Sequence, residues 1–280
     1  MAINKLFNKS FLTRTISGIL LVAIILVTTI VGEDICFVTL LLASLIGLAE
    51  LYKVIGINAN KLGLFGYLAT TLYFILIRFT GFKYVSVFII GYLLLVMAVY
   101  VFSFPAHKTE EILMTFFGLI YVPVLMSHIY MVRISEGGIY TVWLIFICAW
   151  GCDTCAYLTG VTMGKHKMAP VLSPKKSIEG AVGGVIGAAA LGAIYGNFVQ
   201  ARVTGIPDTV LVFGIIGAAG ALISMIGDLA ASAIKRNYNI KDYGKLIPGH
   251  GGILDRFDSI LFTAPVVYYL LEFIGSKYIH

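Results

Sequence analysis

Residues 84–104 read YVSVFIIGYLLLVMAVYVFSF and contain no charged side chain. The hydrocarbon core of a bilayer is about 30 Å thick, and a helix needs about 20 apolar residues to cross it. This stretch is both long enough and apolar enough. It therefore predicts a membrane-spanning helix.

The rest of the chain repeats this pattern. Of its 280 residues, 59% are hydrophobic and only 12% are charged, whereas a soluble domain carries about 25% charged residues. This composition excludes a soluble enzyme, a secreted disulfide scaffold and a disordered chain. We expect an all-α, polytopic membrane protein with about nine transmembrane helices, at 13–31, 35–56, 62–80, 84–104, 112–132, 139–161, 178–200, 208–234 and 252–274.

The Lys and Arg residues predict how these helices are oriented. Cytoplasmic loops are enriched in cationic side chains. With the N-terminus in the cytoplasm, the outer segments hold only Arg78, Lys83, Arg133, Arg202 and Lys277 of the 20 Lys and Arg residues. Nine spans then place the C-terminus outside, and the location expected is the cytoplasmic membrane. The net charge of +6 is mostly this topology signal, and no basic tract indicates a nucleic-acid partner.

Charged residues within the spans are distributed unevenly. Before residue 150 only Glu50 and Arg78 lie in apolar stretches, and both are interpreted as interfacial because they lie near span ends. Four aspartates then appear in or at the edges of later spans: Asp153, Asp228, Asp255 and Asp258. We therefore expect residues 1–140 to form a scaffold of transmembrane helices and 141–280 to carry a cytoplasm-facing catalytic site.

Two regular patterns are interpreted as packing. Gly180, Gly184, Ala188, Gly192 and Gly196 recur every four residues, which lets helix backbones approach closely, within one chain or in a homodimer. Three cysteines also share the sixth span, at positions 148, 152 and 155. A zinc or redox site there would need a fourth ligand or an exposed thiol, so small packing residues are the preferred interpretation.

The eighth span carries a polar stripe. Gly220, Ser224, Asp228, Ser232 and Arg236 recur at every fourth position and share one helix face. A carboxylate within the membrane is costly unless it is partnered, so Asp228 is a functional candidate. The alternative is a structural ion pair with a Lys or Arg of a neighbouring helix.

The start of the ninth span supplies further carboxylates. Asp255 and Asp258 share a helix face, and a glycine-rich turn, Pro248–Gly252, precedes them. Carboxylates together with phosphate oxygens suit Mg²⁺, and nearby Lys and Arg side chains suit phosphate. A glycine hairpin without a ligand is an equal alternative for the turn alone, and Lys175 and Lys176 are also explained as topology signals. The sequence contains no P-loop, so a bound nucleotide would be held by another device.

Residues 232–258, SAIKRNYNIKDYGKLIPGHGGILDRFD, resemble the signature of the phosphatidate cytidylyltransferase (CDP-diacylglycerol synthase) family, S-x-x-K-R, then K-D-x-G, then P-x-H-G-G-x-x-D-R-x-D. All thirteen fixed positions match: Ser232, Lys235, Arg236, Lys241, Asp242, Gly244, Pro248, His250, Gly251, Gly252, Asp255, Arg256 and Asp258. The resemblance extends to Asp228, to the region of Asp153 and to the S-P-K-K-S-x-E-G run at 173–180.

This resemblance implies the reaction CTP + phosphatidate → CDP-diacylglycerol + pyrophosphate in phospholipid biosynthesis. It implies Mg²⁺ held by Asp228 and Asp255, with Asp258 and Asp153 as second candidates, and leaves room for a monovalent cation such as K⁺. It implies catalytic roles for Lys176, Lys235 and Arg236. Substrate binding is implied for Lys175, Ser232, Lys241, His250, Gly251, Gly252 and Arg256.

Two other functions are compatible with parts of the pattern. A secondary transporter would also use intramembrane aspartates and helices broken by glycine, but it commonly shows such interruptions in both halves. A related enzyme acting on another lipid phosphate could use the same motifs. The signature favours the cytidylyltransferase.

Overall fold

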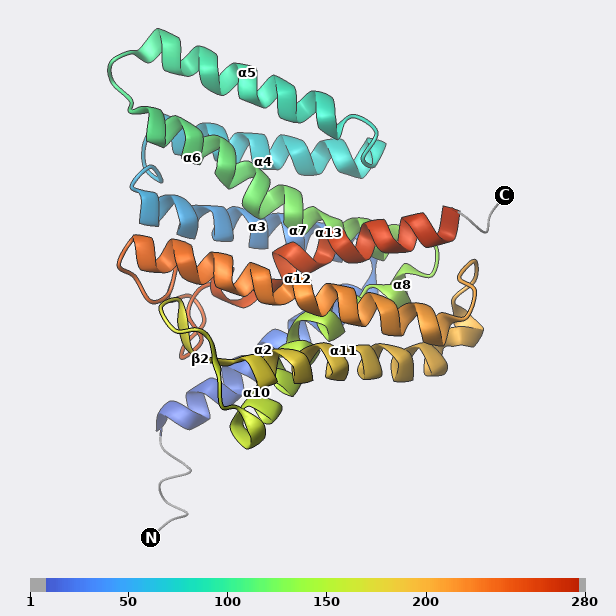
Figure 1. The fold of residues 1–280 in the computed structure, drawn as a ribbon. Helices are drawn as coiled ribbons and strands as arrows, with labels where there is room; N and C mark the ends of the chain where they lie inside the picture. Colours follow the sequence, from blue (N-terminus) through green and yellow to red (C-terminus); the bar gives the residue numbers. More distant parts are fainter. Residues whose placement is uncertain (1–8, 277–280) are drawn as a thin grey trace. The chain divides into compact units, whose positions relative to one another are not determined.

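The computed structural model describes residues 9–276, which form helices, one short hairpin and their connections (Figure 1). These residues divide into two compact units. The first contains the described residues up to Ser127 together with Ile240–Arg256, and the second contains His128–Asn239 together with the described residues from Phe257. The expected division between a scaffold in residues 1–140 and a catalytic site in 141–280 concerns function, and it stays a prediction.

The first unit is built from consecutive apolar helices. They are α2 (Lys9–Val31), α3 (Glu33–Ile55), α4 (Lys61–Thr80), α5 (Val85–Ser103), α6 (Thr109–Leu119), the π-helical turn η1 (Ile120–Val124) and the start of α7 (Leu125–Ile134). The π-helical turn contains Pro123, which cannot donate a backbone hydrogen bond and so disturbs the regular α-helical pattern.

The helices α3, α4 and α6 contact one another (Figure 1), and Tyr52 of α3 is fully buried among them. Its hydroxyl donates to the carbonyl oxygen of Thr115 at 2.8 Å. A Cβ atom added at Gly66 of α4 or at Gly118 of α6 would collide with the Tyr52 ring. The two glycines therefore make room for one large, fully buried side chain, which is the dense packing expected of a protein interior.

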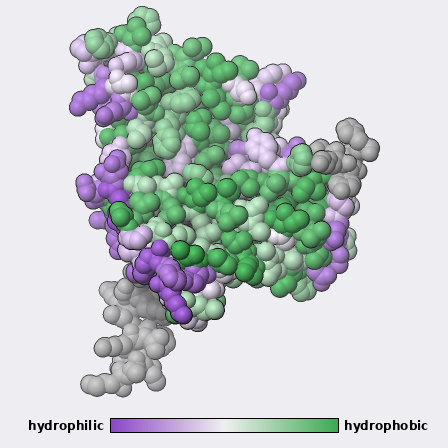
Figure 2. Space-filling view, in the orientation of Figure 1, coloured by the Kyte–Doolittle hydropathy of each residue, from purple (hydrophilic) through white to green (hydrophobic). Residues whose placement is uncertain are grey.

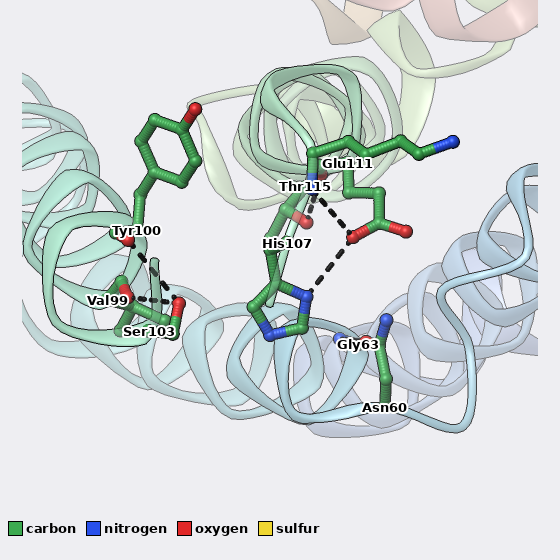
Figure 3. A network of polar contacts seen from close by, with 9 residues as sticks. Asn60, Gly63, Val99, Tyr100, Ser103, His107, Glu111 and Thr115 are labelled. Atoms are coloured by element: carbon green, nitrogen blue, oxygen red, sulfur yellow. Dashed lines mark hydrogen bonds and ion pairs between the residues drawn. The ribbon is translucent and has the colours of Figure 1, made fainter. Parts of the chain in front are cut away.

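The connection between α5 and α6 is closed by local hydrogen bonds (Figure 3). The Glu111 carboxylate accepts from the backbone N–H of Lys108 at 3.3 Å and lies 3.1 Å from His107 Nδ1. Asn60 caps the start of α4 in the same way, accepting from the Gly63 N–H at 3.0 Å. These contacts satisfy helix-end groups and involve none of the candidate site residues.

The second unit contains the remaining helices and the hairpin. Its elements are the rest of α7, α8 (Gly138–Thr141), α9 (Trp143–Phe146), the π-helical turn η2 (Ile147–Gly151), α10 (Cys152–Met163), β1 (Lys167–Ala169), β2 (Ser173–Ser177), α11 (Ile178–Val199), the 3₁₀ turn η3 (Gln200–Arg202), α12 (Thr209–Asn237) and α13 (Leu254–Ser276) from Phe257 onward.

The small-residue face of α11 is buried inside this unit, against α10 and α12. A Cβ atom at Gly192 would meet the carbonyl oxygen of Phe213, and one at Gly217 would meet that of Ala188. The backbones of α11 and α12 therefore lie in close contact, side by side in Figure 1. This confirms the packing interpretation of the glycine pattern and shows that the face is used within one chain.

The cysteines of the sixth span also serve packing. Cys148 and Cys152 are fully buried, and their thiols donate to the carbonyl oxygens of Ile216 and Ala221 on α12. Within residues 9–276, all the cysteines are free and no three His, Cys, Asp or Glu side chains form a group that could hold a metal.

Eight helical segments of the described chain are long and apolar enough to cross a membrane. They correspond to the expected spans from 35–56 to 252–274. The remaining expected span, 13–31, falls on α2, whose apolar part is the shorter Thr15–Val31. In the face drawn in Figure 2, hydrophobic side chains cover the middle of the helices in each unit and hydrophilic ones gather toward their ends. The polytopic all-α fold is thus confirmed, while the orientation of the termini stays a prediction.

The orientation can be tested with single cysteines at two exposed loop positions. In a variant whose four native cysteines are replaced by alanine, we expect Thr204→Cys to react with a membrane-impermeant maleimide added to intact cells. Ala59→Cys, which follows the second expected span, should react only after the membrane is opened. The reverse labelling pattern would show that the chain is inserted with the opposite orientation.

Candidate functional site

The hairpin before α11 places the two candidate lysines of the second unit. β1 and β2 pair antiparallel, with Lys167 opposite Ser177. Ser177 caps α11 by accepting from the Gly180 N–H at 3.1 Å, a role for which serine is strongly preferred. Glu179 accepts from the backbone N–H of Lys165 at 3.0 Å. Both ends of the hairpin are therefore fastened to the start of α11, and the hairpin carries Lys175 and Lys176 from there.

Asp228 of α12 forms an ion pair with Lys176 of this hairpin. The two side chains are 26% and 24% exposed, so neither charge is fully surrounded by water. Ser224, one turn earlier on the same face of α12, is fully buried. Asp228 is therefore paired, as the alternative of a structural ion pair predicts. Its partner, however, comes from a hairpin and not from a neighbouring helix.

A second ion pair lies farther along α12. Lys235 Nζ is 3.8 Å from Asp258 Oδ2 of α13, and both side chains are less than 15% exposed. Asp258 Oδ1 also accepts from the Ser259 N–H at 2.8 Å. A Cβ atom at Gly227 would lie 3.0 Å from the Asp258 carbonyl oxygen. α12 and α13 therefore approach closely beside Asp228, which brings two carboxylates and two lysines into one region of the second unit.

A cavity of about 410 Å³ opens next to the hairpin. Asp153, Lys175 and Lys176 supply charged groups to its lining, and Tyr157 and Val161 supply apolar surface. Charged groups combined with a mainly apolar wall are suited to a ligand that is itself part anion and part hydrocarbon.

In the first unit, Asp255 holds the glycine-rich turn Pro248–Gly252 of the signature, here called the signature turn, by hydrogen bonds. Its Oδ2 atom accepts hydrogen bonds from the backbone N–H groups of Tyr243 at 2.8 Å, Gly252 at 3.0 Å and Gly244 at 3.4 Å. The side chain is buried. Gly251 has a φ of 91°, a conformation that favours glycine, and a Cβ atom there would lie 2.9 Å from Asp255 Oδ2. Turn and carboxylate therefore fit together closely.

Glu50 of α3 contacts the other side of the same segment. Its Oε1 atom accepts from the Ile253 N–H at 3.1 Å, and its Oε2 atom accepts from the Leu254 N–H at 2.9 Å. These are amide groups at the start of α13, which have no partner within the helix. The interfacial interpretation of Glu50 therefore missed its main contact.

Ser17 of α2 reaches the tip of the turn. Its hydroxyl lies 2.9 Å from the Pro248 carbonyl oxygen and 2.8 Å from His250 Nδ1. This contact could not be anticipated, because Ser17 looks like an ordinary small residue of an apolar helix. For Glu50 a signal was present, since a carboxylate within an apolar span calls for a partner.

The remaining candidates lie close in sequence to these groups. Ser232 is half-buried one turn after Asp228, Arg236 is exposed near the end of α12, Lys241 is exposed in the connection to α13, and Arg256 is half-buried in the first turn of α13. The predicted residues thus form two groups. The first unit holds Lys241, His250, Gly251, Gly252, Asp255 and Arg256, and the second holds Asp153, Lys175, Lys176, Asp228, Ser232, Lys235, Arg236 and Asp258.

The donor chemistry of the second unit fits Mg²⁺ better than zinc. Asp228 and Asp258 offer hard carboxylate oxygens from two helices in contact, whereas the neighbouring thiols Cys148 and Cys152 are committed to packing. Mg²⁺ typically takes one or two carboxylates and completes its shell with water and substrate phosphates. Such a site does not require a cluster of three protein ligands.

Comparison with known proteins agrees with the signature. The chain is 29% identical to the phosphatidate cytidylyltransferase of Bacillus subtilis (strain 168) over 274 residues, which cover 92% of this chain and 96% of that one. It is 40% identical to that of Haemophilus influenzae over 137 residues and 42% identical to that of Synechocystis over 131 residues. These two alignments cover 49% and 46% of this chain, and 47% and 42% of the relatives.

The family comparison covers nearly all of the chain, including both groups of candidate residues. The match runs from residue 12 to residue 274. The chain therefore belongs to the cytidylyltransferase family.

Proposed function

We propose that this membrane enzyme converts CTP and phosphatidate into CDP-diacylglycerol and pyrophosphate, a step of phospholipid biosynthesis. The observation that carries the proposal is the signature turn ordered around Asp255 in a chain of the cytidylyltransferase family. The names of the bacterial relatives support the substrate pair. We place the enzyme in the cell membrane with its site open to the cytoplasm, because CTP arrives from water while acyl chains stay in lipid.

The reaction needs charge neutralisation more than proton transfer. A phosphate oxygen of the lipid attacks the α-phosphorus of CTP in line, the bond from that phosphorus to the bridging oxygen breaks, and pyrophosphate leaves with the electron pair. The nucleophile is already an anion, so no strong general base is required. The protein must align two phosphates that repel each other and stabilise the charge that develops. Lys176, Lys235 and Arg236 are the cations assigned to this task.

Asp228 and Asp255 are the residues proposed to hold Mg²⁺, with Asp258 and Asp153 as second candidates and a monovalent cation such as K⁺ as an additional occupant. When bound, the metal supplies positive charge to triphosphate oxygens. The ion pairs of the second unit suit this role. Asp228 and Lys176 neutralise each other, and the reaction needs them separately, the carboxylate for a cation and the ammonium group for a phosphate.

The other signature residues are proposed to bind substrate. They are Lys175, Ser232, Lys241, His250, Gly251, Gly252 and Arg256. Lys175 and Lys176 line the cavity beside apolar side chains of α10. That combination supports binding of a lipid phosphate there, with the cations at the headgroup and the apolar wall along the acyl chain.

The proposed reaction is tested by pyrophosphate release from detergent-purified protein. We expect release only when CTP, Mg²⁺ and phosphatidate are all present, because each supplies a group that the others cannot replace. Omitting any one of them should lower the rate to background. Equal release with another lipid phosphate in place of phosphatidate would favour the related enzyme, and no release with the complete mixture would contradict the proposal.

Neutral variants of the two metal-binding candidates test the site. Asp228→Asn and Asp255→Asn keep the side-chain shape but lose the negative charge, and each should lower kcat by at least about 100-fold. Both proteins should insert and purify normally, since asparagine offers an oxygen that can still accept hydrogen bonds. Near-wild-type turnover in either variant would contradict the metal assignment for that residue.

Lys108→Ala serves as a control that removes a positive charge from a different loop. Its backbone N–H, and not its side chain, contacts Glu111, so pyrophosphate release should remain within about twofold of wild type. A large loss would mean that the site extends beyond the residues assigned to it.

A further inference from the structure

Glu50 is the only acidic residue in the expected apolar spans of the first 140 residues. The proposed reaction assigns it no role. It lies on α3, 203 positions before the backbone group that it contacts. Both of its oxygens accept hydrogen bonds from the start of α13, at 3.1 and 2.9 Å. The helix that begins there carries Asp255 in its first turn.

Two carboxylates hold the segment from Tyr243 to Leu254. Asp255 Oδ2 accepts from the amides of Tyr243, Gly244 and Gly252, and Glu50 accepts from those of Ile253 and Leu254. Five amide groups, which would otherwise need water or other partners, are thus bound to acidic side chains. Hydrogen bonds to a charged acceptor are roughly twice as strong as neutral ones, so the backbone of this segment is well fixed.

The Glu50 carboxylate also gives a steric reason why two positions of the signature are glycine. A Cβ atom at Gly252 would collide with both oxygens of the Glu50 carboxylate. A Cβ atom at Gly244 would collide with Oε1 of the same group. Two fixed positions of the signature are therefore glycine where Glu50 approaches the backbone. A residue outside the signature accounts for the residue type at two positions within it.

We propose that Glu50 is a positioning residue for the reaction: it fixes the first turn of α13 and thereby the orientation of the Asp255 carboxylate. The proposal rests on the proposed function for its consequence in catalysis but not for the structural contact itself. Partners that orient a metal-binding carboxylate commonly change metal affinity or activity by about 10- to 100-fold when they are lost. A role of this size is what we assign to Glu50.

The contact is tested without substrate by hydrogen exchange followed by mass spectrometry. Glu50→Gln removes the charge and turns one acceptor oxygen into an amide donor that faces another donor. We expect peptides covering residues 243–256 to exchange faster than in wild type, while peptides from α11 remain protected. Unchanged exchange of 243–256, or faster exchange throughout the chain including α11, would overturn the positioning role.

The effect of this contact on the reaction is tested with the same Glu50→Gln variant. In Glu50→Gln we expect kcat for pyrophosphate release to fall about 10- to 100-fold and half-maximal activation to require more Mg²⁺, while KM for CTP changes less. Glu50→Asp keeps the carboxylate and should recover part of kcat. Wild-type kcat and Mg²⁺ dependence in Glu50→Gln would overturn the proposal.

The matched control is Glu110→Gln, the same substitution at an exposed residue in the first turn of α6. It should leave exchange of residues 243–256 and kcat unchanged, and a loss as large as that of Glu50→Gln would overturn the specific role of Glu50. The two readouts also separate two failures. If wild type does not use CTP and phosphatidate, the proposed function fails, while faster exchange of 243–256 in Glu50→Gln would still support the contact.

Discussion

A carboxylate removed from water must recover its lost hydration from the protein, and this requirement shapes the segments that carry the candidate site residues. Taking an ion out of water costs several kcal/mol even after relaxation, while a hydrogen bond to a charged group returns roughly 1.5–3 kcal/mol. Asp255 receives three such bonds and Glu50 two. Asp228 and Asp258 are compensated by lysines. Each solution ties together segments that are distant in sequence, so compensating the charge also builds the site.

Compensating buried carboxylates with backbone amides has a second consequence, which is that the carboxylate must approach the backbone closely. Glu50 can approach the backbone closely enough to accept from the Ile253 and Leu254 amides because Gly244 and Gly252, which lie against its carboxylate, have no side chains. The same geometry recurs without charge in the second unit, where the glycine face of α11 lets its backbone touch that of α12. Glycine therefore has two uses in this chain. It brings helices together in the membrane, and it admits carboxylates to the backbone of the segment that carries the family signature.

The features predicted correctly from the sequence are the local ones. Eight spans follow from hydropathy alone, and the packing role of the small residues from Gly180 to Gly196 follows from their spacing within one helix. The contacts that sequence reasoning missed join positions far apart, such as Glu50 with Ile253 or Ser17 with His250. Periodicity within one segment carries no information about such partners. For Asp228 the sequence left two interpretations open, because an ion pair and a binding site require the same carboxylate and differ only in what lies opposite.

These two interpretations of Asp228 need not compete. The proposed reaction brings the negative charges of two phosphates to one place, and the proposed site combines cations with carboxylates that would bind a metal. Unpaired, these groups would repel or be expensive to bury. Paired as Lys176 with Asp228 and Lys235 with Asp258, they are neutral as sets before substrate arrives. In the proposed reaction, incoming phosphate and metal would take over partners that already exist, so the ion pair that lowers the cost of burial would also keep the candidate site prepared for its ligands.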